Sequence, residues 1–243
     1  MTTPKLLLLH GLGATAGVWP AVVAAVAWPG PVSTPDLPGH GTAPWTGSYT
    51  LHALAGEIGG RLGDDEPVLI VGHSLGGAVG LELASGRYRP RVTGVVGIGI
   101  KTTWTDDDVA GMARVAERGV RWFDSRADAA DRLRRQAGLD GLVDDDHPAV
   151  TSGVVEDPSG SGRWRPAQDP ATFAQQPLDL AELLDAAQCP VILGAGEHDA
   201  MATRSELSAF TTEPRIAAGR GHNVHVEDPA WVAGLVAELA PTG

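Results

Sequence analysis

The sequence predicts an α/β fold, with a mostly parallel sheet of about six strands and helices on both faces. Three observations favour this fold. Short apolar segments typical of strands buried on both faces alternate with amphipathic helical segments along the 243 residues. A Gly-x-Ser-x-Gly pentapeptide directly follows one apolar segment, and glycine-bounded polar loops follow three others. The length and the 43% of apolar residues suit one large domain with a sizeable core.

Each element follows from local composition. Continuous apolar character marks the predicted strands, which are residues 5–9, 32–34, 68–71, 92–98, 191–193 and 215–217. Apolar positions at helical spacing mark the predicted helices, which are residues 18–27, 51–62, 75–84, 180–187, 204–210 and 229–239. The last helix has the clearest start, because Asp228 precedes it as N-cap and Pro229 occupies its first position.

A long excursion between the fourth and fifth strands interrupts this alternation. One helix is expected to begin after Thr105, whose hydroxyl caps an acidic first turn, and a second to span residues 127–137 and end at Gly138. Residues 156–162 are too rich in Gly, Ser and Pro for a regular element. We therefore expect residues 1–100 and 178–243 to form the core and residues 101–177 to form a helical lid.

Composition excludes several classes of function. The net charge of −12 argues against nucleic-acid binding, and the basic run Arg132 to Arg135 is interpreted as a solvated helix face. The single Cys189 leaves no internal disulfide and is expected to pack in the interior. The chain begins with neither a signal peptide nor a membrane span, so we expect a cytoplasmic protein. The pattern specifies no oligomeric state.

The pentapeptide places Ser74 at the point where a buried strand turns into a helix. The strand at residues 68–71 is followed by Gly-His-Ser-Leu-Gly, and the helix at residues 75–84 begins at once. The flanking glycines permit a strained turn that a Cβ atom would block, and the turn thrusts the serine hydroxyl out of the sheet. Strain of this kind is typical of a reactive site.

These motifs resemble those of the α/β-hydrolase superfamily. The elbow serine, a carboxylate in the loop after residues 191–193 and a histidine in the loop after residues 215–217 follow the family order Ser, Asp, His. The resemblance extends from residue 5 to residue 229 and includes Asp-Leu-Pro-Gly-His-Gly at residues 36–41. Family members usually begin with a further hairpin of two strands. Only four residues precede the first strand here, which is why a reduced sheet is expected.

The resemblance and the chemistry together assign a catalytic triad. Ser74 is the expected nucleophile, His222 the base that accepts its proton, and Asp199 the carboxylate that orients the imidazole. His225 competes with His222, while Glu197 and, less plausibly, Asp106 compete with Asp199.

Two backbone N–H groups are expected to form the oxyanion hole. One belongs to Leu75 at the start of the elbow helix and the other to Leu12 in the first loop.

No metal or cofactor is expected. The loops after residues 191–193 and 215–217 contain four side chains that could bind a metal, His198, Asp199, His222 and His225. These side chains form neither the helical i, i+4 pair nor the cysteine clusters that zinc sites use. Residues 11–13, Gly-Leu-Gly, lack the third glycine and the acidic residue of a dinucleotide site.

Aromatic residues suggest an apolar acyl pocket. Five of the twelve aromatics of the chain lie in the expected lid, namely Trp104, Trp122, Phe123, Trp164 and Phe173. All of these except Phe123, together with Trp19 after the first loop, are predicted to contact substrate. The alternative is that the lid tryptophans only pack the lid against the sheet. Arg163 and Arg165 flank a Gly/Ser turn, where they either contact an anionic group or are solvated.

The predicted function is hydrolysis of a small to medium apolar carboxylic ester, thioester or lactone through an acyl-enzyme. Ser74 differs from the aspartate nucleophile of the dehalogenases and epoxide hydrolases in the family. Asn223 stands where carbon–carbon hydrolases carry a tryptophan, and Ala78 where menaquinone-pathway lyases carry an arginine. The alternatives are carbon–carbon hydrolysis, a lyase reaction or cofactor-free oxidation on the same triad, or a non-catalytic receptor for a small ligand.

Overall fold

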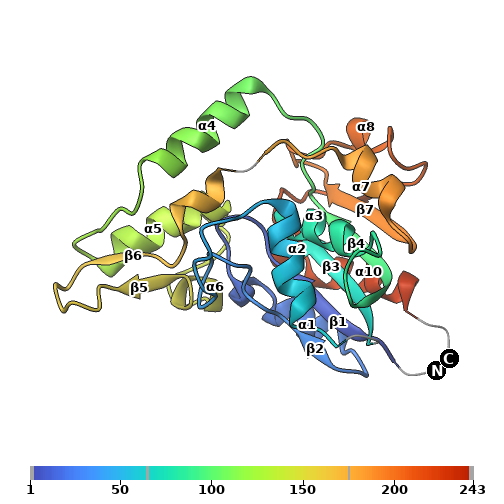
Figure 1. The fold of residues 1–243 in the computed structure, drawn as a ribbon, viewed down its shortest axis with the longest axis horizontal. Coiled ribbons are helices and arrows are strands. Elements are labelled where there is room, and N and C mark those ends of the chain that lie inside the picture. Colours follow the sequence, from blue (N-terminus) through green and yellow to red (C-terminus); the bar gives the residue numbers. More distant parts are fainter. Residues whose placement is uncertain (1–2, 64–65, 175, 241–243) are drawn as a thin grey trace.

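A six-stranded parallel sheet forms the centre of the protein (Figure 1). The computed structural model describes residues 3–63, 66–174 and 176–240. The strand order is β2-β1-β3-β4-β7-β8, so the chain starts at the strand next to one edge, adds the edge strand β2 and then builds toward the other edge. The strands are β1 Lys5–Leu9, β2 Val32–Ser33, β3 Pro67–His73, β4 Arg91–Ile98, β7 Val191–Gly196 and β8 Arg215–Ala217.

Helices cover both faces of the sheet, because successive apolar side chains along each strand point to opposite faces and both faces must be buried. In β1, Leu7 and Leu9 face one apolar cluster, while Leu6 and Leu8 face the other. The first cluster contains side chains of α2 Leu51–Gly60, α3 Leu75–Leu83, α7 Leu180–Ala186 and α8 Arg204–Leu207. The second contains side chains of α1 Pro20–Val26, α9 Val224–Glu227 and α10 Pro229–Leu239.

The predicted fold class is confirmed, with strands at all six expected positions. Helix boundaries differ slightly from the prediction. Helix α1 begins at Pro20 after the short 3₁₀ helix η1 Ala16–Val18, because proline lacks the N–H needed further inside a helix. Helix α8 ends at Leu207 and not at residue 210.

Helix α3 lies so close to the sheet that glycine is required at the contact. A Cβ atom on Gly76 would lie 2.2 Å from the carbonyl oxygen of Leu9, and one on Gly72 would lie 2.4 Å from that of Gly76. Both distances are far below van der Waals contact. The two glycines of the pentapeptide therefore let the elbow helix dock on β1.

The expected lid segment forms a separate group of elements beside the core (Figure 1). Its helices are α4 Asp106–Glu117, α5 Arg126–Ala137, α6 Pro148–Thr151 and the 3₁₀ helix η2 Pro170–Phe173. Thr105 and Asp108 form a reciprocal capping box at the start of α4, and Gly138 ends α5 in the left-handed conformation.

One correction concerns the description of this segment as helical. Strands β5 Val154–Glu156 and β6 Trp164–Pro166 form an antiparallel hairpin in it. Each strand has only three residues, which are too few to produce a periodic pattern of apolar residues. The two segments are extended because they form hydrogen bonds with each other. Residues 157–162 of the Gly/Ser-rich turn have no regular structure, as predicted, whereas Glu156 is the last residue of β5.

Two further properties bear on the composition arguments. Within the described ranges, no helix has both the length and the apolar character needed to cross a membrane. Cys189 is half-buried against the first apolar cluster, and burial raises the pKa of its thiol to about 11. The thiol therefore stays protonated and unreactive near neutral pH.

Candidate active site

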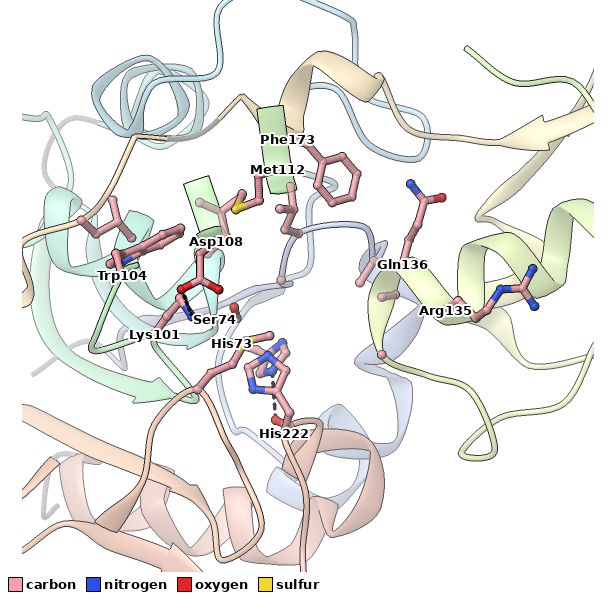
Figure 2. A pocket seen from close by; sticks show the side chains of 18 residues that line it. His73, Ser74, Lys101, Trp104, Asp108, Met112, Arg135, Gln136, Phe173 and His222 are labelled. Carbon is pink, nitrogen blue, oxygen red and sulfur yellow. Dashed lines mark hydrogen bonds and ion pairs between the residues drawn. The ribbon is translucent and has the colours of Figure 1, made fainter. Parts of the chain in front are cut away.

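Ser74 occupies a strained turn between β3 and α3. Its φ of 49° and ψ of −116° put a non-glycine residue in a region that L-amino acids rarely adopt. The Ser74 N–H donates to the carbonyl of Ile98 at 2.8 Å, which holds the turn against the end of β4. The side chain lines the main cavity of the protein (Figure 2).

Asp199 and His222 are joined by a hydrogen bond between the loops that follow β7 and β8. The distance between Asp199 Oδ2 and His222 Nδ1 is 2.9 Å. The other carboxylate oxygen accepts from the Met201 N–H at 2.8 Å, and Asp199 is buried. Because an ionised carboxylate only accepts hydrogen bonds, Nδ1 carries the proton and Nε2 is left free to act as a base.

Ser74 and His222 line the same cavity without a bond between their side chains. Among the residues that the structure describes, no hydrogen bond joins the Ser74 hydroxyl to the imidazole. Such contacts are often long before substrate binds and shorten in the reacting complex. The arrangement thus brings the three residues expected from the sequence to one end of the sheet, with the imidazole and the carboxylate already paired.

Gly99 lies against the candidate site and was not identified from the sequence. It follows β4 with a φ of +62°, and a Cβ atom there would lie 3.0 Å from Asp199 Oδ2 and 3.1 Å from His222 Cε1. A side chain would therefore press on the Asp199–His222 pair. The available signal was a glycine directly after a strand whose neighbours in the sheet carry Ser74 and Asp199.

Two buried histidines hold the loop that contains Leu12. The His10 ring accepts from the Leu37 N–H through Nε2 at 3.0 Å, so its Nδ1 donates to the carbonyl of Gly11 at 2.8 Å. His40 Nε2 accepts from the Gly13 N–H at 3.2 Å. Burial lowers the pKa of both imidazoles, that of His40 to about 3, which keeps them neutral.

The N–H groups of Leu12 and Leu75 remain available to a ligand. Among the described residues, neither donates a hydrogen bond to another backbone group. Leu75 is the first residue of α3, where the helix itself offers no partner to the N–H. Both residues line the cavity beside Ser74, as a pair of oxyanion donors must.

Two more imidazoles pack behind His222. His73 Nε2 donates to the His222 carbonyl at 3.1 Å, and the two rings lie 4.6 Å apart. His225 is fully buried between His73 and Trp19, with ring distances of 4.2 and 4.8 Å. Burial lowers the pKa of His225 to about 3, and neither of its nitrogens has a protein partner in the described structure. A fully buried His225 cannot reach a substrate, which favours His222 as the base.

The competing carboxylates lie elsewhere. Glu197 is exposed and accepts from the Gly219 N–H at 2.8 Å, so it stabilises the loop and does not contact His222. Asp106 is exposed in the first turn of α4.

In the described part of the chain, no group of three or more His, Cys, Asp and Glu side chains is arranged to hold a metal ion.

A mainly apolar cavity of about 320 Å³ lies above Ser74. Core residues form its floor, and the expected lid segment supplies the opposite wall (Figure 2). The apolar lining residues are Leu12, Ala14, Leu75, Trp104, Met112, Ala137, Phe173, Leu178 and Met201. On one side an ion pair of 3.2 Å joins Lys101 to Asp108, and Gln136 lies on the other side.

Only two of the five predicted pocket aromatics, Trp104 and Phe173, line this cavity. The prediction that Trp19, Trp122 and Trp164 also line the pocket is wrong. Trp19 is fully buried against His225 in the second core cluster.

Trp122 and Trp164 lie in the 101–177 segment but not at the cavity. The Arg163 and Arg165 guanidinium groups lie over the Trp122 ring at 5.6 and 5.5 Å. Trp164 lies in β6 and packs on the small apolar cluster around Leu133. Their spacing in the sequence does not distinguish these packing roles from pocket roles.

Comparison with known proteins gives consistent matches. A family model described as the alpha/beta hydrolase family matches residues 6–235. A Neisseria meningitidis serogroup A protein named pimeloyl-[acyl-carrier protein] methyl ester esterase is 31% identical over 199 residues, which are 81% of this chain and 62% of that protein. The protein of the same name from Aromatoleum aromaticum is 33% identical over 251 residues, covering 98% of this chain and 99% of its own length.

A solved structure shows the same fold. The crystal structure of E-2-(acetamidomethylene)succinate hydrolase superposes with a TM-score of 0.79 at 20% identity, covering 98% of this chain and 91% of that chain. The chain spans less than two thirds of the serogroup A relative, 62% of its length.

The geometry predicts unequal effects for the two candidate acids. Asp199→Asn should lower kcat/KM by about 10³- to 10⁴-fold, because the amide no longer selects the tautomer with a free Nε2. Glu197→Gln should change kcat/KM by less than about threefold, because Glu197 does not contact His222. Steady-state ester hydrolysis by both variants checks this, and equal losses would contradict the assignment of Asp199.

Stability toward acid should depend on His225. Its pKa of about 3 in the folded protein lies below the value of 6.5 for a free imidazole, so the unfolded state binds the extra proton between these pH values. The free energy of unfolding therefore falls as the pH drops below 6.5, by about 2 kcal/mol per such histidine between pH 7.5 and 5. Urea unfolding at both pH values should show that His225→Leu reduces this loss by about that amount. The exposed His198→Leu serves as control and should leave the loss unchanged.

Proposed function

Because this chain belongs to the alpha/beta hydrolase family, we propose that it hydrolyses carboxylic esters with Ser74, His222 and Asp199 as its catalytic triad. One observation carries the proposal. The 2.9 Å bond from Asp199 to His222 leaves the other ring nitrogen free beside a strained elbow serine in one apolar cavity. This combination has no evident structural purpose, since a strained serine costs about 1–3 kcal/mol of stability.

The proposed reaction has two steps. The Ser74 hydroxyl attacks the ester carbonyl while His222 Nε2 takes its proton, and the imidazolium then protonates the departing alcohol. Water next attacks the acyl-serine and loses a proton to His222, and the imidazolium returns this proton to Ser74 Oγ as the acid is released. Asp199 stabilises the imidazolium in both steps through the bond to Nδ1.

The oxyanion of each tetrahedral intermediate is proposed to bind the N–H groups of Leu12 and Leu75. The positive end of α3 strengthens the Leu75 donor. His10 and His40 act indirectly, because their bonds to Gly11 and Gly13 fix the direction of the Leu12 N–H.

The cavity supports an apolar acyl group of small to medium size as substrate. Its volume of about 320 Å³ lies near the lower end for ligand pockets. The relatives from Neisseria meningitidis and Aromatoleum aromaticum are named for a pimeloyl-[acyl-carrier protein] methyl ester, in which the alcohol part is a methyl group. We extend this class, an acyl ester of a small alcohol, to the present chain. A cytoplasmic location and closure of the cavity by residues 101–177 as a lid are parts of the same proposal.

Ser74 reactivity is the direct test. A fluorophosphonate probe should label wild-type protein at Ser74 and should not label Ser74→Ala. The same variant should lose about 10⁴-fold or more in kcat/KM on small aryl esters while keeping its melting temperature within a few degrees. A variant that keeps a tenth of wild-type kcat/KM would overturn the nucleophile assignment, and labelling without turnover of any ester would favour a ligand receptor.

Acyl length preference should depend on Trp104. Lengthening the acyl group of an aryl ester from two to four carbons should raise kcat/KM about tenfold, since each buried methylene contributes about 0.8 kcal/mol. Trp104→Ala should reduce this gain, because Trp104 lines the cavity. Trp122→Ala is the matched control and should keep the gain, because Trp122 lies outside the cavity. A steady decline from acetate onward would refute an apolar acyl pocket.

A further inference from the structure

A second, smaller cavity lies within the 101–177 segment. Its volume is about 90 Å³, and the end of α4, the loop after it, α5 and β6 form its walls. Four arginines line it, Arg118, Arg121, Arg132 and Arg165, and no carboxylate does. We call it the arginine pocket. It concentrates positive charge in a protein whose net charge is −12.

The guanidinium groups of this pocket have no ion-pair partners. Among the described residues, none of the four takes part in an ion pair, although Arg165 donates to the Pro166 carbonyl at 2.9 Å. Burial, followed by the charges of Arg121, Arg135 and Arg118, lowers the pKa of Arg132. Mutual repulsion of like charges costs stability unless an anion compensates it.

Two other arginines of the same segment are paired with carboxylates. Arg134 lies on α5 and binds both Asp131 and Asp145. Arg163 is 3.3 Å from Asp157 in the hairpin turn. Among the described residues, carboxylates thus pair with Arg134 and Arg163 outside the pocket and with none of the four arginines inside it.

Two amide oxygens at the wall of the pocket also lack partners. Gln168 is 5% exposed, and its Nε2 donates to Thr172 Oγ1 at 2.7 Å, yet its Oε1 has no hydrogen bond among the described residues. Gln136 Oε1 is likewise buried without a partner. A buried amide oxygen without a donor lowers the stability of the protein, and a ligand N–H or O–H would remove that cost.

The arginine pocket borders the acyl cavity through Gln136. This residue lines both cavities and faces the side of the acyl cavity opposite Trp104 (Figure 2). A group held in the arginine pocket is therefore a neighbour of a substrate at Ser74.

We propose that the arginine pocket binds a phosphate group through the guanidinium groups of Arg118, Arg121, Arg132 and Arg165. The planar guanidinium matches phosphate oxygens in two parallel hydrogen bonds, and a doubly charged phosphate offsets more of the four positive charges than one carboxylate does. The single O–H of a free HPO4²⁻ ion, or a hydroxyl or N–H group elsewhere in a phosphate-bearing ester, donates to one of the Gln136 and Gln168 oxygens. The phosphate is either a free ion or part of the ester substrate, and the second case rests on the proposed hydrolase function.

Calorimetric titration of the protein with inorganic phosphate, at constant ionic strength set by chloride, tests the pocket. Wild-type protein should bind phosphate with saturation, and Arg132→Gln should weaken binding about tenfold or more, as expected for loss of a charge-assisted hydrogen bond. Arg163→Gln is the matched control and should bind within about twofold of wild type, because Arg163 is paired outside the pocket. The exposed Arg121→Gln gives a second test in case Arg132→Gln does not fold. Absence of saturable binding to wild type, or unchanged binding by both pocket variants, overturns the proposal.

Steady-state kinetics with two ester substrates identify the source of the phosphate. The two esters have the same acyl group, and their alcohol parts differ only in carrying a phosphate or a hydroxyl. A phosphate carried by the substrate should raise kcat/KM, and Arg132→Gln should lower the ratio between the two esters about tenfold. Equal rates for both esters, with phosphate bound in calorimetry, assign the pocket to the free ion. The titration does not depend on ester hydrolysis and is repeated with Ser74→Ala. Failure of all ester turnover would therefore refute the hydrolase proposal, while the calorimetric result on the pocket would still stand.

Discussion

The close contact of α3 with the sheet is the constraint on which the site depends. Gly76 lies against the Leu9 carbonyl and Gly72 against the Gly76 carbonyl, and a single methyl group at either position would push the helix away. With the helix this close, the chain has no room for a relaxed turn, and Ser74 takes a positive φ. The core packing of α3 therefore stabilises the strained serine conformation, and the hydroxyl faces the cavity.

Parallel strands bring the other site residues to the same end of the sheet. The loops after β7 and β8 carry Asp199 and His222, and Gly99 after β4 leaves space for their hydrogen bond. Asn223 ties this arrangement to the 101–177 segment, because its Nδ2 donates to the carbonyls of Gly138 at 2.8 Å and Ala137 at 3.2 Å. The position of the proposed base is thus coupled to the end of α5, which also forms part of the cavity wall.

Buried neutral imidazoles surround the proposed triad. His10 and His40 bind backbone groups on both sides of Leu12, and His73 binds the His222 carbonyl. Burial lowers the pKa of each of these rings. An uncharged ring can orient a loop without adding a positive charge that would oppose protonation of His222 during the reaction. The same burial makes these rings a source of instability in acid.

Local sequence signals determined the fold class, the strand positions and the residues of the proposed triad. Apolar runs of strand length and glycine at tight turns act within a few residues, so Ser74, Asp199 and His222 were predictable as side chains at the same end of a parallel sheet. Only the tertiary structure decided which lid side chains share a cavity. Trp104 and Phe173 line it, while Trp122 packs outside it, although all three are aromatic residues of the same segment. The strands of the β5–β6 hairpin are too short to leave a periodic pattern. The arginine pocket arises from contacts between residues far apart in sequence, which leave no such pattern either.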